Sequence, residues 1–304
     1  MYLWQQELFC LKWFINVCSL VFVRKIAKNA LDFLGYSNLF LALAVFCSTF
    51  QGRFIFKHVN DSAISFSVLN FVAAFFLYNL QRIYQSSLPT TDSRLLWYCK
   101  NKKWIFTLAI LLGVLLFQPL WYIVVDYKEG ILVYCVCAIL SVFYFLPPLN
   151  FRKTPYMKQF YIAFIWVIVC IVIPFMFDES FFLGLKVFYK DEILYVISQF
   201  CFIAALCIPF DIRDFNKDKE EGTRSVPVMI GIKNAKWFSI SLLFIYFILS
   251  FFIEVKSLVG IRGIVFVAAS LVVWFSDTHR HRYYYIYLAD GIIVLQTVLL
   301  AYLL

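Results

Sequence analysis

The sequence is poor in charge, since only 15% of its 304 residues are Asp, Glu, Lys or Arg, whereas 63% are hydrophobic. A soluble domain of this length would have too few polar side chains to cover its surface, so a soluble globular protein is excluded. The long apolar runs also lack the alternation of period two that marks the strands of a membrane β-barrel. The chain is therefore predicted to be an all-α membrane protein.

Other absences narrow the kind of site and the domain organisation. The nine cysteines include no C-x-x-C pair and lie mainly in apolar runs, which argues against a disulfide framework or a zinc site. The first eleven residues carry no positive charge, so no secretory signal is indicated. Because no linker rich in Pro, Gly or Ser divides the chain, we expect one domain at 31–304, preceded by an interfacial amphipathic segment at 1–30.

Nine apolar stretches have the length of a membrane span, or nearly so. They cover about 36–51, 62–86, 104–125, 130–147, 157–177, 190–210, 235–254, 259–276 and 286–303. With the N-terminus in the cytoplasm, 20 of the 27 Lys and Arg residues fall in inner segments and 7 in outer ones. This imbalance satisfies the positive-inside rule, and it accounts for the net charge of +9 without nucleic acid as a partner.

An acidic tract follows the sixth of these stretches. Asp211, Asp214 and Asp218 begin one residue after Phe210, and Pro209 is expected to interrupt the helix just before them. Within one helix, steps of three and four residues place three carboxylates within an arc of roughly 60°. Oxygen ligands that converge in this way suit a hard cation. The tract is predicted to bind Mg²⁺ or Ca²⁺, and the alternative is an ordinary solvated loop.

The tract closely resembles the second aspartate-rich motif of the UbiA-type intramembrane prenyltransferase superfamily. That motif reads Asp-x2-Asp-x3-Asp-x3-Gly-x3-(small or apolar)-Pro-x3-Gly, and Gly222, Pro227 and Gly231 complete it here. The resemblance implies a ring of nine transmembrane helices around a central lipid-open cavity. It also implies acids that bind Mg²⁺ and, through it, an isoprenoid diphosphate, with the active site on the cytoplasmic side of a bacterial membrane.

The first aspartate-rich motif of that superfamily, Asn-Asp-x2-Asp-x3-Asp, is degenerate in this chain. The matching stretch keeps Asn79, but the acidic positions are occupied by Leu80, Ile83 and Ser87. With three acids fewer, one Mg²⁺ is expected rather than two. Arg82 shares a helical face with Asn79; it either supplies charge to a phosphate in place of a metal or only extends to the membrane interface.

Further residues complete the predicted site. The loop after the fourth stretch is similar to the basic segment with which the family contacts diphosphate, although its cations also serve the positive-inside rule. Asp290 falls within the ninth stretch and is expected either to serve the acceptor or to make a structural hydrogen bond. The predicted catalytic and metal-binding residues are Asp211, Asp214 and Asp218; the diphosphate-binding residues are Asn79, Arg82, Arg152, Lys158 and Arg213; the acceptor or cavity residues are Tyr78, Tyr144 and Asp290.

The favoured function is Mg²⁺-dependent transfer of a prenyl group from an isoprenoid diphosphate to an aromatic or other lipid-soluble acceptor. The degenerate first motif motivates an alternative, a catalytically impaired relative that binds or presents an isoprenoid lipid or assists a partner enzyme. An ion-coupled transporter is disfavoured, because the acids lie at one membrane surface and no sequence repeat is evident. The acceptor, the prenyl length and the oligomeric state are left open.

Overall fold

The computed structural model describes residues 24–56, 61–86, 92–117, 120–121, 128–144, 154–155, 157–176 and 189–303. Every regular element in these ranges is a helix, which confirms the predicted all-α class. Six helices are long and apolar enough to cross a membrane, and the number is seven if the bent pair Arg24–Tyr36 and Leu39–Gly52 forms one span. The chain thus has the helices of a multi-pass integral membrane protein.

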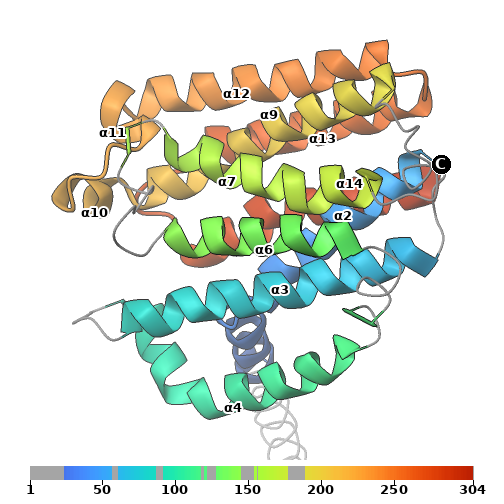
Figure 1. Ribbon diagram of the computed structural model, residues 1–304. Coiled ribbons are helices and arrows are strands. Elements are labelled where there is room, and N and C mark those ends of the chain that lie inside the picture. Colours follow the sequence, from blue (N-terminus) through green and yellow to red (C-terminus); the bar gives the residue numbers. More distant parts are fainter. Residues whose placement is uncertain are drawn as a thin grey trace, which may run out of the picture.

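Figure 1 shows the course of the helices along the chain. In the first half they are α2 (Leu39–Ile55), α3 (Asp61–Ser86), α4 (Ser93–Leu115), α6 (Lys128–Phe143), and α7 (Met157–Val167), which continues through the π-helix η2 (Ile168–Val172) into α8 (Ile173–Met176). In the second half they are α9 (Lys190–Arg213), α10 (Phe215–Glu220), α11 (Val226–Ile230), α12 (Ile232–Leu249), η3 (Ser250–Phe252), α13 (Ser257–Trp274), the π-helix η4 (Tyr284–Ala289) and α14 (Asp290–Leu303).

Two predicted spans, 104–125 and 130–147, are not among these six or seven. In α4 the first turns contain Lys100, Lys102 and Lys103, so the apolar part of the helix begins only at Trp104. In α6 the apolar helix covers Ile131–Phe143, which is about 20 Å and shorter than a bilayer core of about 30 Å. Of the predicted segment at 1–30, residues 1–23 lie outside the described ranges, and the rest begins the helix Arg24–Tyr36.

Helix α9 lies at the centre of the packing. It contacts α7 on one side and α12 on the other, and α2 joins this group to α3 and α14. Ala204 and Ala205 are fully buried and allow close approach of the neighbouring helices, while Phe202 stacks on Tyr246 of α12 with ring centroids 4.7 Å apart. The buried face of α9 thereby holds its last turn, which carries the acidic tract, in a fixed position.

Pro209 does not end α9 as predicted, because the helix continues to Arg213. A proline inside a helix leaves the carbonyl four residues earlier without its usual partner, and here that carbonyl belongs to Ala205. Ser239 of α12 donates its hydroxyl to this oxygen at 2.9 Å. A neighbouring helix thus supplies the hydrogen-bond donor that Pro209 cannot give to the Ala205 carbonyl. Backbone polar groups inside a membrane need such a partner because no water is present there.

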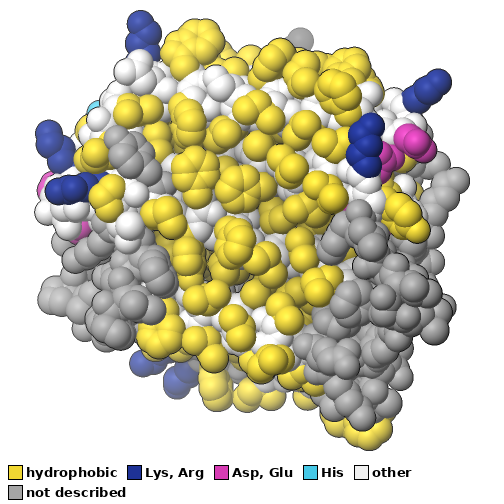
Figure 2. Space-filling model, turned by 45° about the horizontal axis from the view of Figure 1, so that its top comes forward, with side chains coloured by type: hydrophobic (Ala, Val, Ile, Leu, Met, Phe, Trp, Pro, Cys, Tyr) yellow, Lys and Arg dark blue, Asp and Glu magenta, His cyan; other side chains and the backbone are white. Residues whose placement is uncertain are grey.

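The outer surface matches a lipid environment. Figure 2 shows apolar side chains spread over one face of the molecule, with Lys and Arg confined to its edges. On α12 and α13 the exposed apolar residues include Phe244, Ile245, Val267 and Leu271. An apolar face of this extent is unfavourable in water and favourable against acyl chains.

A buried cation, Arg262, lies in the second turn of α13. Arg262 is fully buried, and its guanidinium lies 5.4 Å from the ring centroid of Tyr195 and 4.8 Å from that of Tyr246. All three guanidinium nitrogens lack a hydrogen-bond partner. The charge of Arg262 is therefore stabilised by cation–π contacts with the two tyrosine rings.

Candidate functional site

The acidic tract is interrupted where α9 ends. Asp214 lies between α9 and α10 with φ −89° and ψ 9°, so the three acids do not share the single continuous helix that the sequence suggested. The backbone N–H groups of Asp218 and Thr223 close two successive turns, each at 2.8 Å. Gly222 then takes a φ of +69°, which a glycine adopts without strain. The tract is thus a folded corner at the end of a buried helix.

Lys158 lies between two of the three carboxylates. Its Nζ is 2.7 Å from Asp211 Oδ1 and 2.8 Å from Asp218 Oδ2, and all three residues are buried. Removing these charges from water is costly, and their mutual attraction offsets that cost. The sequence predicted Lys158 as a ligand of diphosphate; the structure places its ammonium on the acids, while the other oxygen of Asp211, Oδ2, has no hydrogen-bond partner.

Asp214 is held by its neighbour in the chain. Arg213 donates from Nε and Nη2 to the two carboxylate oxygens, each at 2.8 Å, and its guanidinium lies over the rings of Phe210 and Tyr285. Burial raises the pKa of Asp214, but the charge and hydrogen bonds of Arg213 lower it more, and the net pKa is below its usual value. Asp214 is therefore ionised, and its carboxylate is partly exposed.

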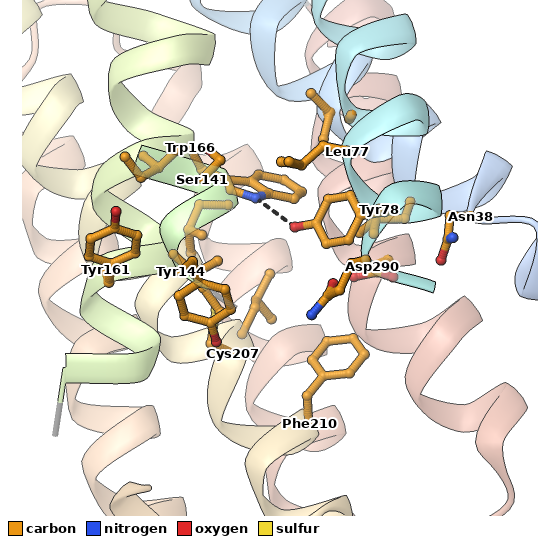
Figure 3. A pocket seen from close by; sticks show the side chains of 18 of the residues that line it. Asn38, Leu77, Tyr78, Ser141, Tyr144, Tyr161, Trp166, Cys207, Phe210 and Asp290 are labelled. Carbon is orange, nitrogen blue, oxygen red and sulfur yellow. Dashed lines mark hydrogen bonds between the residues drawn. The ribbon is translucent and has the colours of Figure 1, made fainter. Parts of the chain in front are cut away.

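A cavity of about 390 Å³ opens beside this corner, lined by residues of α2, α3, α4, α6, α7, α9, α10 and α14 (Figure 3). Asp211, Arg213 and Asp214 line it, whereas Asp218 does not. Inside, Trp166 donates to the hydroxyl of Tyr78 at 3.2 Å, as Figure 3 shows. Tyr144 stacks on Tyr161 with centroids 5.7 Å apart. The cavity therefore has a charged end and an aromatic interior, at a volume typical of small-molecule sites.

Asp290 belongs to the interior rather than to the charged end. It is the first residue of α14, directly after the π-helix η4, and its side chain lines the cavity near Phe210 and Tyr78 (Figure 3). Asp290 is 9% exposed, and within the described ranges its carboxylate makes no hydrogen bond or ion pair. A buried acid without a protein partner is available to a ligand.

Three arginines converge on the mouth of the cavity. Arg82 comes from α3, Arg94 from the first turn of α4 and Arg213 from α9. Arg94 was not singled out from the sequence; burial, together with the charges of Arg82 and Arg213, lowers its pKa well below the usual value. Lys217 lines the same part of the cavity, and the mouth is therefore rich in positive charge.

Asp92 fixes one side of this mouth. It caps α4 by accepting the Arg94 backbone N–H at 2.8 Å, and it forms a short ion pair with Arg282. Burial raises the pKa of Asp92, but the hydrogen bond and charge of Arg282, with the charge of Arg94, lower it to about 2. Asp92 therefore serves as a partner of arginines.

Asn79 lies outside the lining of the cavity. Its side-chain amide donates to the carbonyls of Ser37 at 3.0 Å and Phe75 at 2.8 Å, and it joins α3 to the turn at Asn38, whose φ is +65°. In this structure Asn79 has a structural role, and its predicted contact with diphosphate stays a prediction. Arg152, predicted for the same purpose, lies outside the described residues.

The register of α3 differs from the one inferred for the first motif. Leu80 and Ile83 are exposed at the surface, whereas Tyr78, Gln81 and Gln85 line the cavity with the same x2 and x3 spacing. The cavity-facing positions therefore carry a phenol and two amides. Helical periodicity would have revealed this register, because Arg82 and its neighbours on the buried face recur every three to four residues.

Only two of the three acids are placed where they could bind a hard cation in the cavity. No group of three Asp, Glu, His or Cys residues within the described ranges is placed to hold a metal ion. Asp211 and Asp214 nevertheless line the cavity, and the unpartnered Oδ2 of Asp211 is an oxygen donor of the kind that Mg²⁺ prefers. Asp218 fits a supporting role, since it binds Lys158 and lies behind the cavity wall.

Comparison of the chain with models of known protein families, with curated proteins and with solved structures finds no match in any of the three.

Proposed function

We propose that the protein is a UbiA-like membrane enzyme that transfers a prenyl group from an isoprenoid diphosphate to a lipid-soluble acceptor. The observation that carries this proposal is the polarity of the cavity, in which Asp211, Asp214 and three arginines occupy one end and aromatic and apolar side chains line the rest. An amphiphile with an anionic head and an apolar tail has this same division. The resemblance of the acidic tract to the family motif supports the same substrate.

The proposed architecture is a ring of nine spans with the N-terminus in the cytoplasm. Helices α4 and α6 complete the six or seven spans, and both contribute residues to the lining of the cavity. The mouth would then face the cytoplasm, since it collects Arg82, Arg94, Arg213 and Lys217. In a bacterial cell this places the site at the cytoplasmic membrane.

One Mg²⁺ would be held by Asp211 and Asp214, where it would supply charge to a leaving diphosphate. In the reaction, the bond between the allylic carbon and the diphosphate oxygen breaks and its electron pair leaves with the diphosphate. The arginines of the mouth stabilise that negative charge. The acceptor forms the new bond to carbon, and Asp290 is placed to take the proton that the acceptor loses. The rings of Tyr78 and Tyr144 shelter the developing carbocation without offering a strong nucleophile.

This function is tested by release of diphosphate from farnesyl and longer isoprenoid diphosphates in the presence of Mg²⁺ and a membrane lipid extract. Asp211→Asn and Asp214→Asn are each expected to lower the rate by about 100-fold or more, because each removes a charge at the reacting end. Asp277→Asn is the matched control, since Asp277 is an exposed acid outside the cavity. Unchanged rates in both site variants would contradict the assignment.

A second candidate is a protein that binds or presents an isoprenoid lipid without reacting with it. Two observations favour it: Lys158 and Arg213 neutralise the acids, and amides occupy the cavity-facing positions of α3. This candidate predicts binding of isoprenoid diphosphates with no release of diphosphate at any chain length.

A further inference from the structure

Among the residues that the structure describes, two of the three arginines at the mouth have no anion of their own. Arg213 is satisfied by Asp214 through two hydrogen bonds. Arg82 instead donates from Nη1 to the neutral side chain of Gln85 at 2.9 Å, and its Nε is buried without a partner. No ion pair of Arg82 is present within the described ranges, so its charge is balanced there only at a distance.

Arg94 is in a similar position. Its Nε is also buried without a partner, and its Nη2 lies 3.9 Å from Asp92, at the limit of an ion pair. Asp92 already accepts from Arg282 and from the Arg94 backbone. A buried N–H group that makes no hydrogen bond costs free energy, and a guanidinium next to other guanidiniums costs more. The bound state of the cavity is expected to remove both costs.

We propose that Arg82 and Arg94 form an anion site that holds a diphosphate group directly, without a metal. The identity of the ligand rests on the proposed function, but the site itself rests on the two buried Nε groups that have no hydrogen-bond partner among the described residues. Planar guanidiniums bind phosphate oxygens through paired N–H donors, so two of them match the separate phosphates of one diphosphate. They come from α3 and α4, whereas Asp211 and Asp214 lie in the last turn of α9 and at its end, and α3 contributes amides rather than acids to the lining.

The shape of the cavity favours an amphiphilic diphosphate over a free one. Behind the two arginines the wall continues through Ala73, Ala74, Leu77 and Ile162. Burial of an apolar tail against this wall adds binding free energy, and a free pyrophosphate has no tail to bury. A phospholipid headgroup offers the same phosphate chemistry with a tail, and it is the competing source of the anion.

The test measures binding in excess EDTA, with the purified protein in nanodiscs of neutral phosphatidylcholine. Farnesyl diphosphate and inorganic pyrophosphate are titrated and followed by calorimetry. The wild type is expected to bind farnesyl diphosphate without metal, and more tightly than pyrophosphate. Arg82→Gln and Arg94→Gln are each expected to weaken binding roughly 10- to 100-fold, the value of a charge-assisted hydrogen bond.

Two variants separate this site from general effects. Arg280→Gln removes the same charge from an exposed position outside the cavity, and it is expected to leave the affinity unchanged. Arg94→Lys keeps the charge but loses the planar pair of donors, so an intermediate loss is expected. Thermal unfolding of each variant shows whether the protein is folded at the temperature of the titration.

Three results would overturn the proposal: loss of all wild-type binding in EDTA, an equal effect of Arg280→Gln, or displacement of farnesyl diphosphate by phosphatidylglycerol added to the nanodiscs. The last would assign the arginines to a lipid headgroup. Binding in EDTA without any diphosphate release in Mg²⁺ would sustain this site and remove the proposed enzyme activity. Turnover in Mg²⁺ without binding in EDTA would support the proposed enzyme activity and remove the metal-free anion site.

Discussion

At the scale of single residues, Lys158 supplies the counter-ion of Asp211 and Asp218. It lies 60 residues from Asp218 in the sequence, and the two meet at 2.8 Å. A local pattern identifies a lysine in a basic loop but not the anion that it reaches after folding, and for this reason the sequence assigned Lys158 to diphosphate. The acids themselves were predicted from local spacing, and two of the three line the cavity.

Replacement of Lys158 by Met is expected to destabilise the protein by about 3 kcal/mol, because Asp211 and Asp218 would remain buried without their counter-ion. The free energy of unfolding in mixed micelles measures the effect. Lys217→Met serves as control, since Lys217 is half exposed and its pair with Glu221 spans 3.8 Å, and a change within about 0.5 kcal/mol is expected. Adding Asp211→Asn and Asp218→Asn to Lys158→Met should restore much of the loss. Equal losses for the two lysines would refute this role.

At the scale of helices, six of the nine predicted spans, or seven with the bent pair, correspond to helices long and apolar enough to cross a membrane, and the irregularities inside the helices were missed. The predicted stretch 62–86 agrees with α3 at Asp61–Ser86, because an apolar run bounded by polar residues is a local signal. The continuation of α9 past Pro209 was missed, since it depends on a hydroxyl supplied by α12. The cavity-facing register of α3 was missed because the stretch was aligned to a motif, although Tyr78, Gln81 and Gln85 recur at helical steps of three and four residues.

The bond from Ser239 to the Ala205 carbonyl gives a direct test of this account. Ser239→Ala is expected to cost about 1 to 2 kcal/mol, because it leaves a buried carbonyl without a donor. Ser241→Ala is the matched control, since Ser241 is exposed and bonds only to the carbonyl of Trp237 in its own helix. The two variants are compared by unfolding in mixed micelles. A similar cost for both would mean that the helix tolerates Pro209 without help from α12.

At the scale of the whole molecule, the two ends of the helix bundle differ in charge. The site end collects Arg82, Arg94, Arg213 and Lys217, whereas at the opposite end the loop before α13 binds the start of α9 through Glu254 N–H and Asp191, at 3.1 Å. The imbalance of Lys and Arg was the strongest whole-chain signal in the sequence, because it is summed over many loops and does not depend on any one helix boundary.

The proposed orientation is tested with an amine reagent that does not cross membranes. Lys100 and Lys219 are exposed at the proposed cytoplasmic end, and Lys190 and Lys256 are exposed at the other. In inside-out vesicles the reagent is expected to modify the first pair, and in right-side-out vesicles the second, with mass spectrometry as the readout. Modification of all four from one side would contradict the orientation and the order of spans.

The two π-helical turns have a consequence for the geometry of the cavity. A π-turn contains one residue more than the α-turn it replaces, so it shifts the angular phase of everything that follows by about 100°. In η4 this shift directly precedes Asp290, and in η2 it carries Val169 and Cys170, which line the cavity. Shortening η4 by one residue would rotate Asp290 out of the cavity while changing no side chain in it. Which side chains face the cavity therefore depends on the number of residues in a helix as well as on their identity.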